Sequence, residues 1–209
     1  MRLNRSLGIT ALAAAAALLT APLVSADELA VGTKGPDFKL LGVDGKEHAL
    51  AEIAAKDGKP VAATVVVFTC NHCPFSQAYE PVLLDMAKQY ADKSVSFVFI
   101  NSNDPQVAPD DSYEKMQERA KDKAYPFPYL YDATQTVAKA YGARVTPHVY
   151  VLDSKQVLRY RGRVNDNKDQ TQVKSNDLTT AIDGLLAGKT IETAETKAFG
   201  CSIKWKKES

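Results

Sequence analysis

Two cysteines separated by two residues, Cys70 and Cys73, lie between a run of apolar residues and a helical pattern. The apolar run covers residues 61–68, and the helical pattern that follows covers residues 74–90. This order places the cysteines at a helix N-terminus, where unpaired amide N–H groups and the helix dipole favour a thiolate. Two sulfurs one helical turn apart can also close into a disulfide. The pattern therefore predicts thiol–disulfide chemistry.

The two cysteines are expected to have different roles. Cys70 precedes the helix and is predicted to be the exposed, attacking thiol, whereas Cys73 is predicted to be the shielded, resolving thiol. His72 lies between them, and its protonated imidazole would stabilise a thiolate. A stabilised thiolate favours the reduced form and makes the disulfide more oxidising. His72 is therefore a third candidate catalytic residue.

A zinc site and a structural disulfide are two simpler interpretations of the cysteine pair. A zinc site needs a second pair of ligands, and His48, His72, His148 and Cys201 do not supply one by their spacing. A purely structural disulfide would close a very short loop and would constrain the unfolded chain little. The sequence thus favours a redox function, and no bound metal is expected.

Thr146-Pro147 and Cys201 are the next candidates along the chain. Pro147 stands at the start of an apolar segment, so the bond that precedes it is a candidate cis peptide. Cys201 makes the cysteine count odd, which suggests a reactive thiol, an intermolecular bridge, a ligand or a lone buried cysteine. A sharper hypothesis is that the C-terminal tail returns to the Cys70–Cys73 pair, with Cys201 as a third redox thiol.

The elements that position these residues follow from local patterns. Asp44-Gly45 indicates a hairpin turn, and Asp111 and Asp132 resemble helix caps because Glu114 and Gln135 follow three residues later. The expected elements are a hairpin over 38–50, a short helix over 50–56, a strand over 61–68, a helix over 74–90, a strand over 95–100, helices from Ser112 and from Ala133 to Gly142, strands over 149–152 and 157–160, and a helix over 176–186. A strand–helix–strand order implies a parallel crossover. The fold class is therefore α/β, a mixed central sheet flanked by helices.

The first 26 residues have the layout of a signal peptide. Arg2 and Arg5 precede an uncharged run over 7–21, and Val24-Ser25-Ala26 offers small residues for cleavage. Removing this segment leaves 24 Lys and Arg against 25 Asp and Glu in residues 27–209. This balance argues against nucleic acid as a partner. We expect a single domain with a tail from about residue 188, soluble in the periplasm or secreted, without membrane insertion.

Several segments resemble the redoxin branch of the thioredoxin-fold superfamily, which includes the AhpC/TSA and peroxiredoxin-like proteins. They are Gly35-Pro36-Asp37-Phe38-Lys39-Leu40, Asp44-Gly45-Lys46, Asn101-Ser102-Asn103-Asp104, Tyr125-Pro126-Phe127-Pro128-Tyr129-Leu130 and Ala140-Tyr141-Gly142-Ala143. The resemblance implies a thioredoxin-like fold with an N-terminal hairpin extension. It also implies that Cys70 is the nucleophile, Cys73 the resolving thiol and Thr146-Pro147 the substrate-binding loop.

The expected function is that of an exported thiol–disulfide oxidoreductase without a cofactor. Its partners would be a protein or small molecule that carries a disulfide or thiol, and an upstream redox protein; the direction of electron flow stays open. One alternative is a peroxiredoxin-like peroxidase, although neither cysteine has the T-x-x-C pattern of peroxidatic cysteines. The other is a Cu(I) metallochaperone that uses Cys70 and Cys73, since Cu(I) prefers sulfur ligands.

Overall fold

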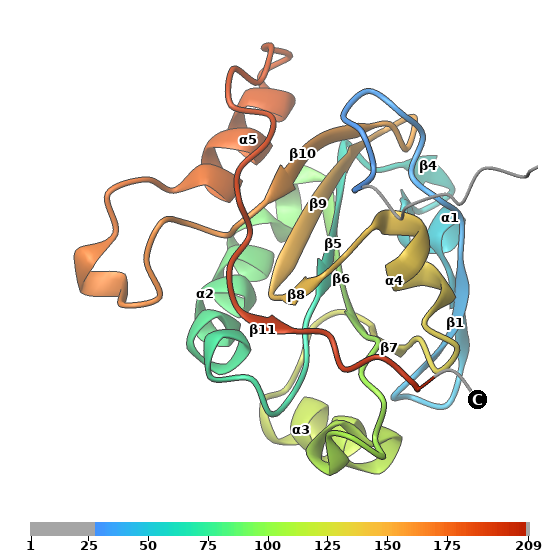
Figure 1. Cartoon of the computed structure of the whole chain (residues 1–209). Helices are drawn as coiled ribbons and strands as arrows, with labels where there is room; N and C mark the ends of the chain where they lie inside the picture. Colours follow the sequence, from blue (N-terminus) through green and yellow to red (C-terminus); the bar gives the residue numbers. More distant parts are fainter. Residues whose placement is uncertain (1–27, 208–209) are drawn as a thin grey trace, which may run out of the picture.

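The computed structural model describes residues 28–207, so the proposed signal peptide over residues 1–26 lies outside the described part of the chain. A central sheet of seven strands has the order β10-β9-β5-β6-β7-β1-β2 (Figure 1). Its strands are β1 (Lys39–Gly42), β2 (Glu47–Ala49), β5 (Ala63–Phe68), β6 (Val95–Asn101), β7 (Tyr129–Tyr131), β9 (His148–Asp153) and β10 (Leu158–Gly162). The helices are α1 (Leu50–Ile53), α2 (Pro74–Tyr90), α3 (Tyr113–Asp122), α4 (Thr136–Tyr141) and α5 (Asp177–Leu186).

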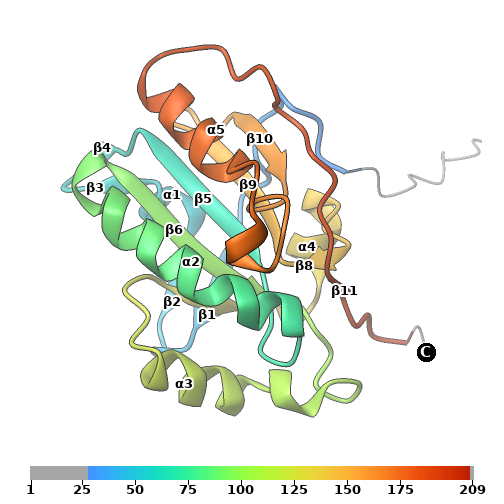
Figure 2. The same ribbon diagram turned by 90° about the vertical axis from the view of Figure 1, so that its left-hand side faces the viewer.

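The strand β5 forms the middle of the sheet, as its apolar sequence predicts. It pairs in parallel with β6 and antiparallel with β9, and every residue of β5 is buried. Because side chains alternate along a strand, Val65 and Val67 face one side of the sheet and Val66 and Phe68 the other. Helices α2, α3 and α5 cover the first side, and α1 and α4 cover the second (Figure 2). The predicted mixed α/β architecture is confirmed.

The predicted hairpin is present as β1 and β2, which pair antiparallel. Gly45 has a φ of 77° in the connecting turn, a conformation that glycine adopts without the steric cost of a side chain. The hairpin joins the main sheet because β1 pairs with β7. The strand β7 is absent from the elements expected from the sequence.

Three local predictions were wrong at element boundaries. The helix expected over 50–56 ends at Ile53, because residues 55–56 and 59–60 form a small antiparallel hairpin, β3 (Ala55–Lys56) with β4 (Lys59–Pro60). The helix expected from Ala133 begins at Thr136, although Gly142 ends it as predicted, with a φ of 67°. The cap of α3 is Ser112, whose hydroxyl accepts from the Lys115 amide. Asp111 is therefore free for another role.

Among the described residues, the segment after α5 contains no further helix and returns along the surface to the middle of the molecule (Figure 1). Near its end lies the short strand β11 (Cys201–Ser202), which pairs antiparallel with β8 (Val145–Thr146). The remaining short elements are the 3₁₀ turns η1 (Ala91–Lys93), η2 (Pro109–Asp111) and η3 (Gln170–Gln172). Within residues 28–207, no helix has both the length and the apolar character that a membrane span requires.

Candidate active site

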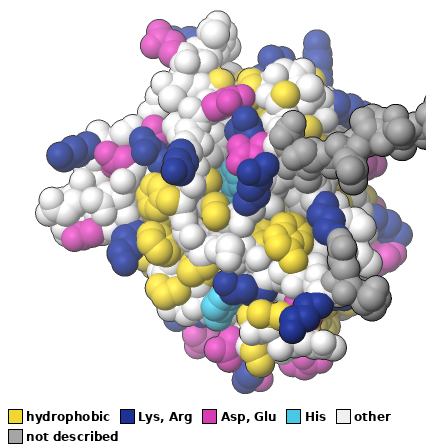
Figure 3. All heavy atoms as spheres, viewed as in Figure 1, with side chains coloured by type: hydrophobic (Ala, Val, Ile, Leu, Met, Phe, Trp, Pro, Cys, Tyr) yellow, Lys and Arg dark blue, Asp and Glu magenta, His cyan; other side chains and the backbone are white. Residues whose placement is uncertain are grey.

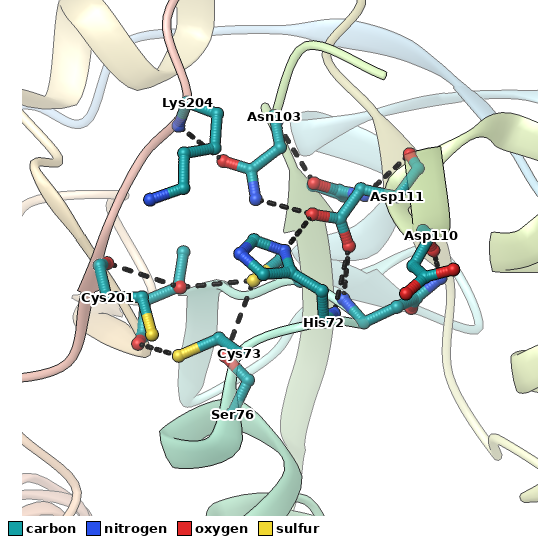
Figure 4. A network of polar contacts seen from close by, with 12 residues as sticks. His72, Cys73, Ser76, Asn103, Asp110, Asp111, Cys201 and Lys204 are labelled. Atoms are coloured by element: carbon teal, nitrogen blue, oxygen red, sulfur yellow. Dashed lines mark hydrogen bonds and ion pairs between the residues drawn. The ribbon is translucent and has the colours of Figure 1, made fainter. Parts of the chain in front are cut away.

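The cysteine pair occupies the predicted junction between β5 and α2. Cys70 lies two residues beyond the end of β5, and Cys73 is the N-cap residue of α2. The Thr69 amide donates to the Ile100 carbonyl oxygen at 2.9 Å, which continues the β5–β6 pairing up to the cysteines. The sheet and the helix thus fix the loop that carries both sulfurs (Figure 4).

The Thr146-Pro147 bond is cis, and the loop that contains it contacts both sulfurs. The Cys70 sulfur lies 3.2 Å from the Thr146 hydroxyl oxygen, and the Cys73 sulfur lies 3.3 Å from the Thr146 carbonyl oxygen. The Ser76 hydroxyl is 3.9 Å from the Cys70 sulfur. The structure therefore places Thr146 next to both cysteines, although Thr146 and Cys70 are 76 residues apart in the sequence.

The thiols differ from the sequence-based expectation in exposure and in charge. Cys70 was expected to be exposed, but it is 3% exposed and Cys73 is 0% exposed, because β11 and the cis-proline loop pack over them. A hydrogen bond from the Cys70 thiol, assisted by one from Cys201 and by the Ser76 amide, lowers the pKa of Cys73 to about 4. The same bond to Cys73, burial and the Asp111 carboxylate raise the pKa of Cys70 far above its ordinary value. Of the two thiols, Cys73 is therefore the one that ionises first.

His72 is held by the carboxylate of Asp111, a residue whose sequence pattern predicts a helix cap. Its Nδ1 lies 2.5 Å from Oδ2 of Asp111, whose side chain is fully buried. The Asn71 amide donates to Oδ1 of Asp111 at 2.6 Å, and the Asn103 side-chain amide donates to Oδ2 at 2.7 Å. Asp111 thus fixes both the imidazole and the backbone between the cysteines (Figure 4).

A compact donor cluster results from this arrangement. The Cys70 sulfur, a ring nitrogen of His72 and a carboxylate oxygen of Asp111 all lie within 4.8 Å of one another. His148, also considered as a possible ligand, does not belong to this cluster: it is buried, and burial lowers its pKa to about 4. The imidazole of this cluster can accept a proton from a thiol, and its sulfur and ring nitrogen are ligand types that also bind soft metal ions.

Cys201 reaches the pair from the C-terminal tail. Cys201 in β11 is paired with Thr146 in β8, and the side chain of Cys201 lies beside that of Cys73 (Figure 4). Upstream, Phe199 packs on Phe75 and Tyr79 of α2, with ring centroids 6.0 and 6.2 Å apart. Figure 3 shows apolar side chains gathered over this part of α2. The expected return of the tail to the cysteine pair is therefore observed.

The model of the AhpC/TSA family matches residues 31–161, well over half of the chain. The chain belongs to the AhpC/TSA family. A structure of an uncharacterised conserved protein from Geobacillus kaustophilus is 40% identical, covers 86% of this chain and 94% of its own, and has a TM-score of 0.79. The exposed lipoprotein thioredoxin of Streptococcus pneumoniae strain TIGR4 is 23% identical, covers 71% of this chain and 99% of its own, and has a TM-score of 0.54. These AhpC/TSA and thioredoxin likenesses confirm the predicted thioredoxin-like fold.

A curated relative of this AhpC/TSA member is the thiol-disulfide oxidoreductase ResA of Geobacillus thermodenitrificans (strain NG80-2). It is 27% identical over 125 residues, which are 60% of this chain and 64% of the relative. The match thus spans somewhat less than two thirds of the relative's length.

Proposed function

We propose that this protein is a thiol–disulfide oxidoreductase whose redox centre is the Cys70–Cys73 pair. The observation that carries the proposal is the placement of two buried thiols at a helix N-terminus, next to a cis-proline loop whose Thr146 contacts both sulfurs. A merely structural cysteine pair has no need of a thiolate, whereas disulfide exchange requires one. The activity in the name of the curated relative, a thiol-disulfide oxidoreductase, supports the same proposal.

In the proposed cycle Cys70 attacks a substrate disulfide and gives its proton to His72. One substrate sulfur leaves as a thiolate, and the other stays on Cys70 in a mixed disulfide. The Cys73 thiolate then attacks the Cys70 sulfur and releases the second substrate thiolate. The substrate is reduced by two electrons, the pair becomes the Cys70–Cys73 disulfide, and an upstream dithiol protein reduces it again.

The choice of Cys70 for the attack rests on the neighbours of its sulfur. Only this sulfur joins the cluster with His72 and Asp111 among the described residues. A proton acceptor held by a buried carboxylate is what a thiol with a raised pKa needs before it can attack. Cys73, whose pKa is low, already carries the charge that resolution requires.

The proposal includes export and a protein substrate. The signal-peptide pattern over residues 1–26 supports removal of this segment and a location in the periplasm or outside the cell. Disulfides persist in those compartments, so disulfide-bearing protein substrates are available there. A polar groove lined by Asn71, His72, Gln77 and Arg119 offers an approach to the site on the side of His72.

Trapping tests the assignment of the two cysteines. The change Cys73→Ser should trap oxidised insulin on Cys70 as a mixed disulfide, because the resolving sulfur is missing. Cys70→Ser should trap none, and Cys201→Ser serves as the control that retains both members of the pair. The adduct is read on a non-reducing gel and must disappear with dithiothreitol. Equal trapping by Cys70→Ser and Cys73→Ser would show that the roles are misassigned.

Cu(I) binding by Cys70 and Cys73 is the second candidate function, and the observation that favours it is a ring nitrogen of His72 within 4.8 Å of the Cys70 sulfur, since copper accepts thiolate and imidazole ligands. Anaerobic titration with a competing chelator decides between the two. Tight binding of one Cu(I), abolished by Cys70→Ser and accompanied by no insulin turnover, would replace the redox proposal.

Peroxide consumption by the same samples tests the peroxidase alternative. Turnover of peroxide that is faster than turnover of insulin would favour a peroxidase.

A further inference from the structure

The position of Cys201 is fixed by the fold on both sides. Upstream, Gly200 lies so close to the cis-proline loop that a side-chain carbon there would come within 2.0 Å of the Thr146 carbonyl oxygen. Downstream, the Ile203 amide donates to the Arg144 carbonyl oxygen at 3.0 Å, and the Lys204 amide donates to Oδ1 of Asn103 at 2.7 Å. The tail therefore holds the third thiol in place at the site.

The three sulfurs form a row with Cys73 in the middle. The thiols of Cys70 and Cys201 both interact with that of Cys73 and lower its pKa, and the side chains of Cys73 and Cys201 lie side by side (Figure 4). Cys201 is half-buried, while the other two cysteines are almost completely buried. The row therefore leads from the interior toward the surface, and each neighbouring pair of thiols is in contact.

We propose that Cys201 is a third redox thiol that exchanges with the Cys70–Cys73 disulfide to give a Cys73–Cys201 disulfide. The Cys201 sulfur attacks the Cys73 sulfur, the S–S bond to Cys70 breaks, and the Cys73–Cys201 bond forms. The proton of Cys201 ends on Cys70, so the number of disulfides is unchanged and no external oxidant is consumed. The inference rests on the proposed redox function of the Cys70–Cys73 pair.

The exchange has a physical purpose in this arrangement. A Cys70–Cys73 disulfide consists of two almost completely buried sulfurs and exposes little of either to an upstream thiolate. A Cys73–Cys201 disulfide includes a half-buried sulfur that an upstream reductant can attack. Cys201 also carries a raised pKa of about 11, from burial and from its hydrogen bond to Cys73. The hydrogen-bond contribution disappears when Cys73 enters a disulfide, because its thiolate is then gone.

Alkylation of the oxidised wild-type protein tests the exchange. In the Cys70–Cys73 form only Cys201 is free, whereas in the Cys73–Cys201 form only Cys70 is free. Prolonged treatment of the oxidised protein with iodoacetamide should therefore label Cys70 in part of the molecules, and Cys201→Ser should lose this label. Non-reducing tryptic maps should join the peptide over 57–88 to the peptide over 198–204. Labelling of Cys201 alone, without the joined peptides, would overturn the proposal.

The variant Cys70→Ser tests whether Cys201 can form a disulfide with Cys73. Oxidised glutathione should convert Cys70→Ser to a form that has lost both free thiols, through a Cys73–Cys201 bond, with two glutathione thiols released. The matched control adds Cys201→Ser and Ser202→Cys to Cys70→Ser, which moves the thiol by one residue to the opposite face of the strand. This control should carry glutathione on its thiols instead of an internal bond. A glutathione adduct in Cys70→Ser itself would also overturn the proposal.

The failures of the two proposals can be told apart on the same samples. Insulin turnover with label on Cys201 alone keeps the redox function and rejects the exchange. Label on Cys70 in the oxidised wild-type protein without any insulin turnover keeps the exchange of sulfurs and rejects the proposed activity.

Discussion

At the scale of single residues, hydrogen bonds rather than the helix terminus alone decide which sulfur carries the charge. The sequence predicts a thiolate at Cys70, but this residue precedes α2 by four positions, whereas Cys73 is its N-cap. The neighbouring thiols of Cys70 and Cys201 also lower the pKa of Cys73. A buried thiolate needs such neighbours because desolvation disfavours the charged form. The low pKa therefore belongs to Cys73.

The reduced protein should contain one thiolate that titrates near pH 4, the pKa of Cys73. Its ultraviolet absorbance should be lost in Cys73→Ser and kept in Cys201→Ser. Because the folded pKa is below the unfolded value of 9.0, the unfolded chain binds one more proton between these values. The stability of the reduced protein should thus rise with pH from about 4 toward 9.0, as measured by urea unfolding against Cys73→Ser. An equal pH slope in both proteins would contradict this assignment.

Asp111 acts on the thiols through another residue, so it is a positioning residue. It accepts hydrogen bonds from the backbone and the ring of His72 and is fully buried. It also raises the pKa of Cys70 by its negative charge. Removal of the Asp111 carboxylate should therefore have two opposite effects on the reactivity of Cys70. The imidazole of His72 would be misplaced, which slows proton transfer, and the Cys70 thiol would ionise more easily.

Asp111→Asn should lower insulin turnover roughly 10²-fold, the typical size of a general acid–base contribution. At the same time, alkylation of Cys70 in a Cys73→Ser background should shift to lower pH. Asp110→Asn is the matched control, because this neighbouring side chain is exposed. A loss of stability that leaves the pH dependence of alkylation unchanged would indicate a purely structural role for Asp111.

At the scale of elements, the cis-proline loop is already paired. The strand β11 lies antiparallel to β8, so the main chain of Thr146 has a partner from the same polypeptide. The predicted role of Thr146-Pro147 in substrate binding remains a prediction, and the approach from the side of His72 avoids β11. The close contact at Gly200 is what allows the two short strands to meet.

Gly200→Ala should separate β11 from β8, because the new carbon would collide with the Thr146 backbone at a φ of 156°. We expect a loss of about 1–3 kcal/mol in the free energy of unfolding and faster alkylation of Cys201. Gly184→Ala is the control: it lies inside α5 with the nearest atom 3.9 Å away, so it should be neutral or stabilising by up to about 1 kcal/mol. Equal effects of the two changes would contradict the role given to Gly200.

At the scale of the whole molecule, the proposed export predicts where the mature chain begins. Residues 27–209 carry nearly equal numbers of basic and acidic side chains. In cells that export the protein, mass spectrometry of the mature form should show an N-terminus at Asp27, since cleavage is predicted after Ala26. Replacing Ala26 by a bulky residue should leave the precursor uncleaved. An intact N-terminal segment on the active protein in the cytoplasm would contradict export.

Sequence patterns were enough to predict the sheet centre, the helix α2, the hairpin and the location of the cysteine pair. These features depend on neighbours in the chain: apolar periodicity, turn residues and the order of strand and helix. The strand β7 was missed because its aromatic residues give no period-two alternation. Its membership in the sheet depends on β6 and β1, which are distant in sequence.

The surroundings of the sulfurs could not be predicted from the sequence, because they come from distant parts of the chain. Asp111 meets His72 across 39 residues, and Cys201 arrives from the far end of the chain. Local pattern made Asp111 resemble a helix cap, and the cysteine count left the role of Cys201 open. The burial of both thiols and the charge on Cys73 depend on which segments pack together. Such contacts arise from the packing of the complete chain and are not encoded in the spacing of near neighbours.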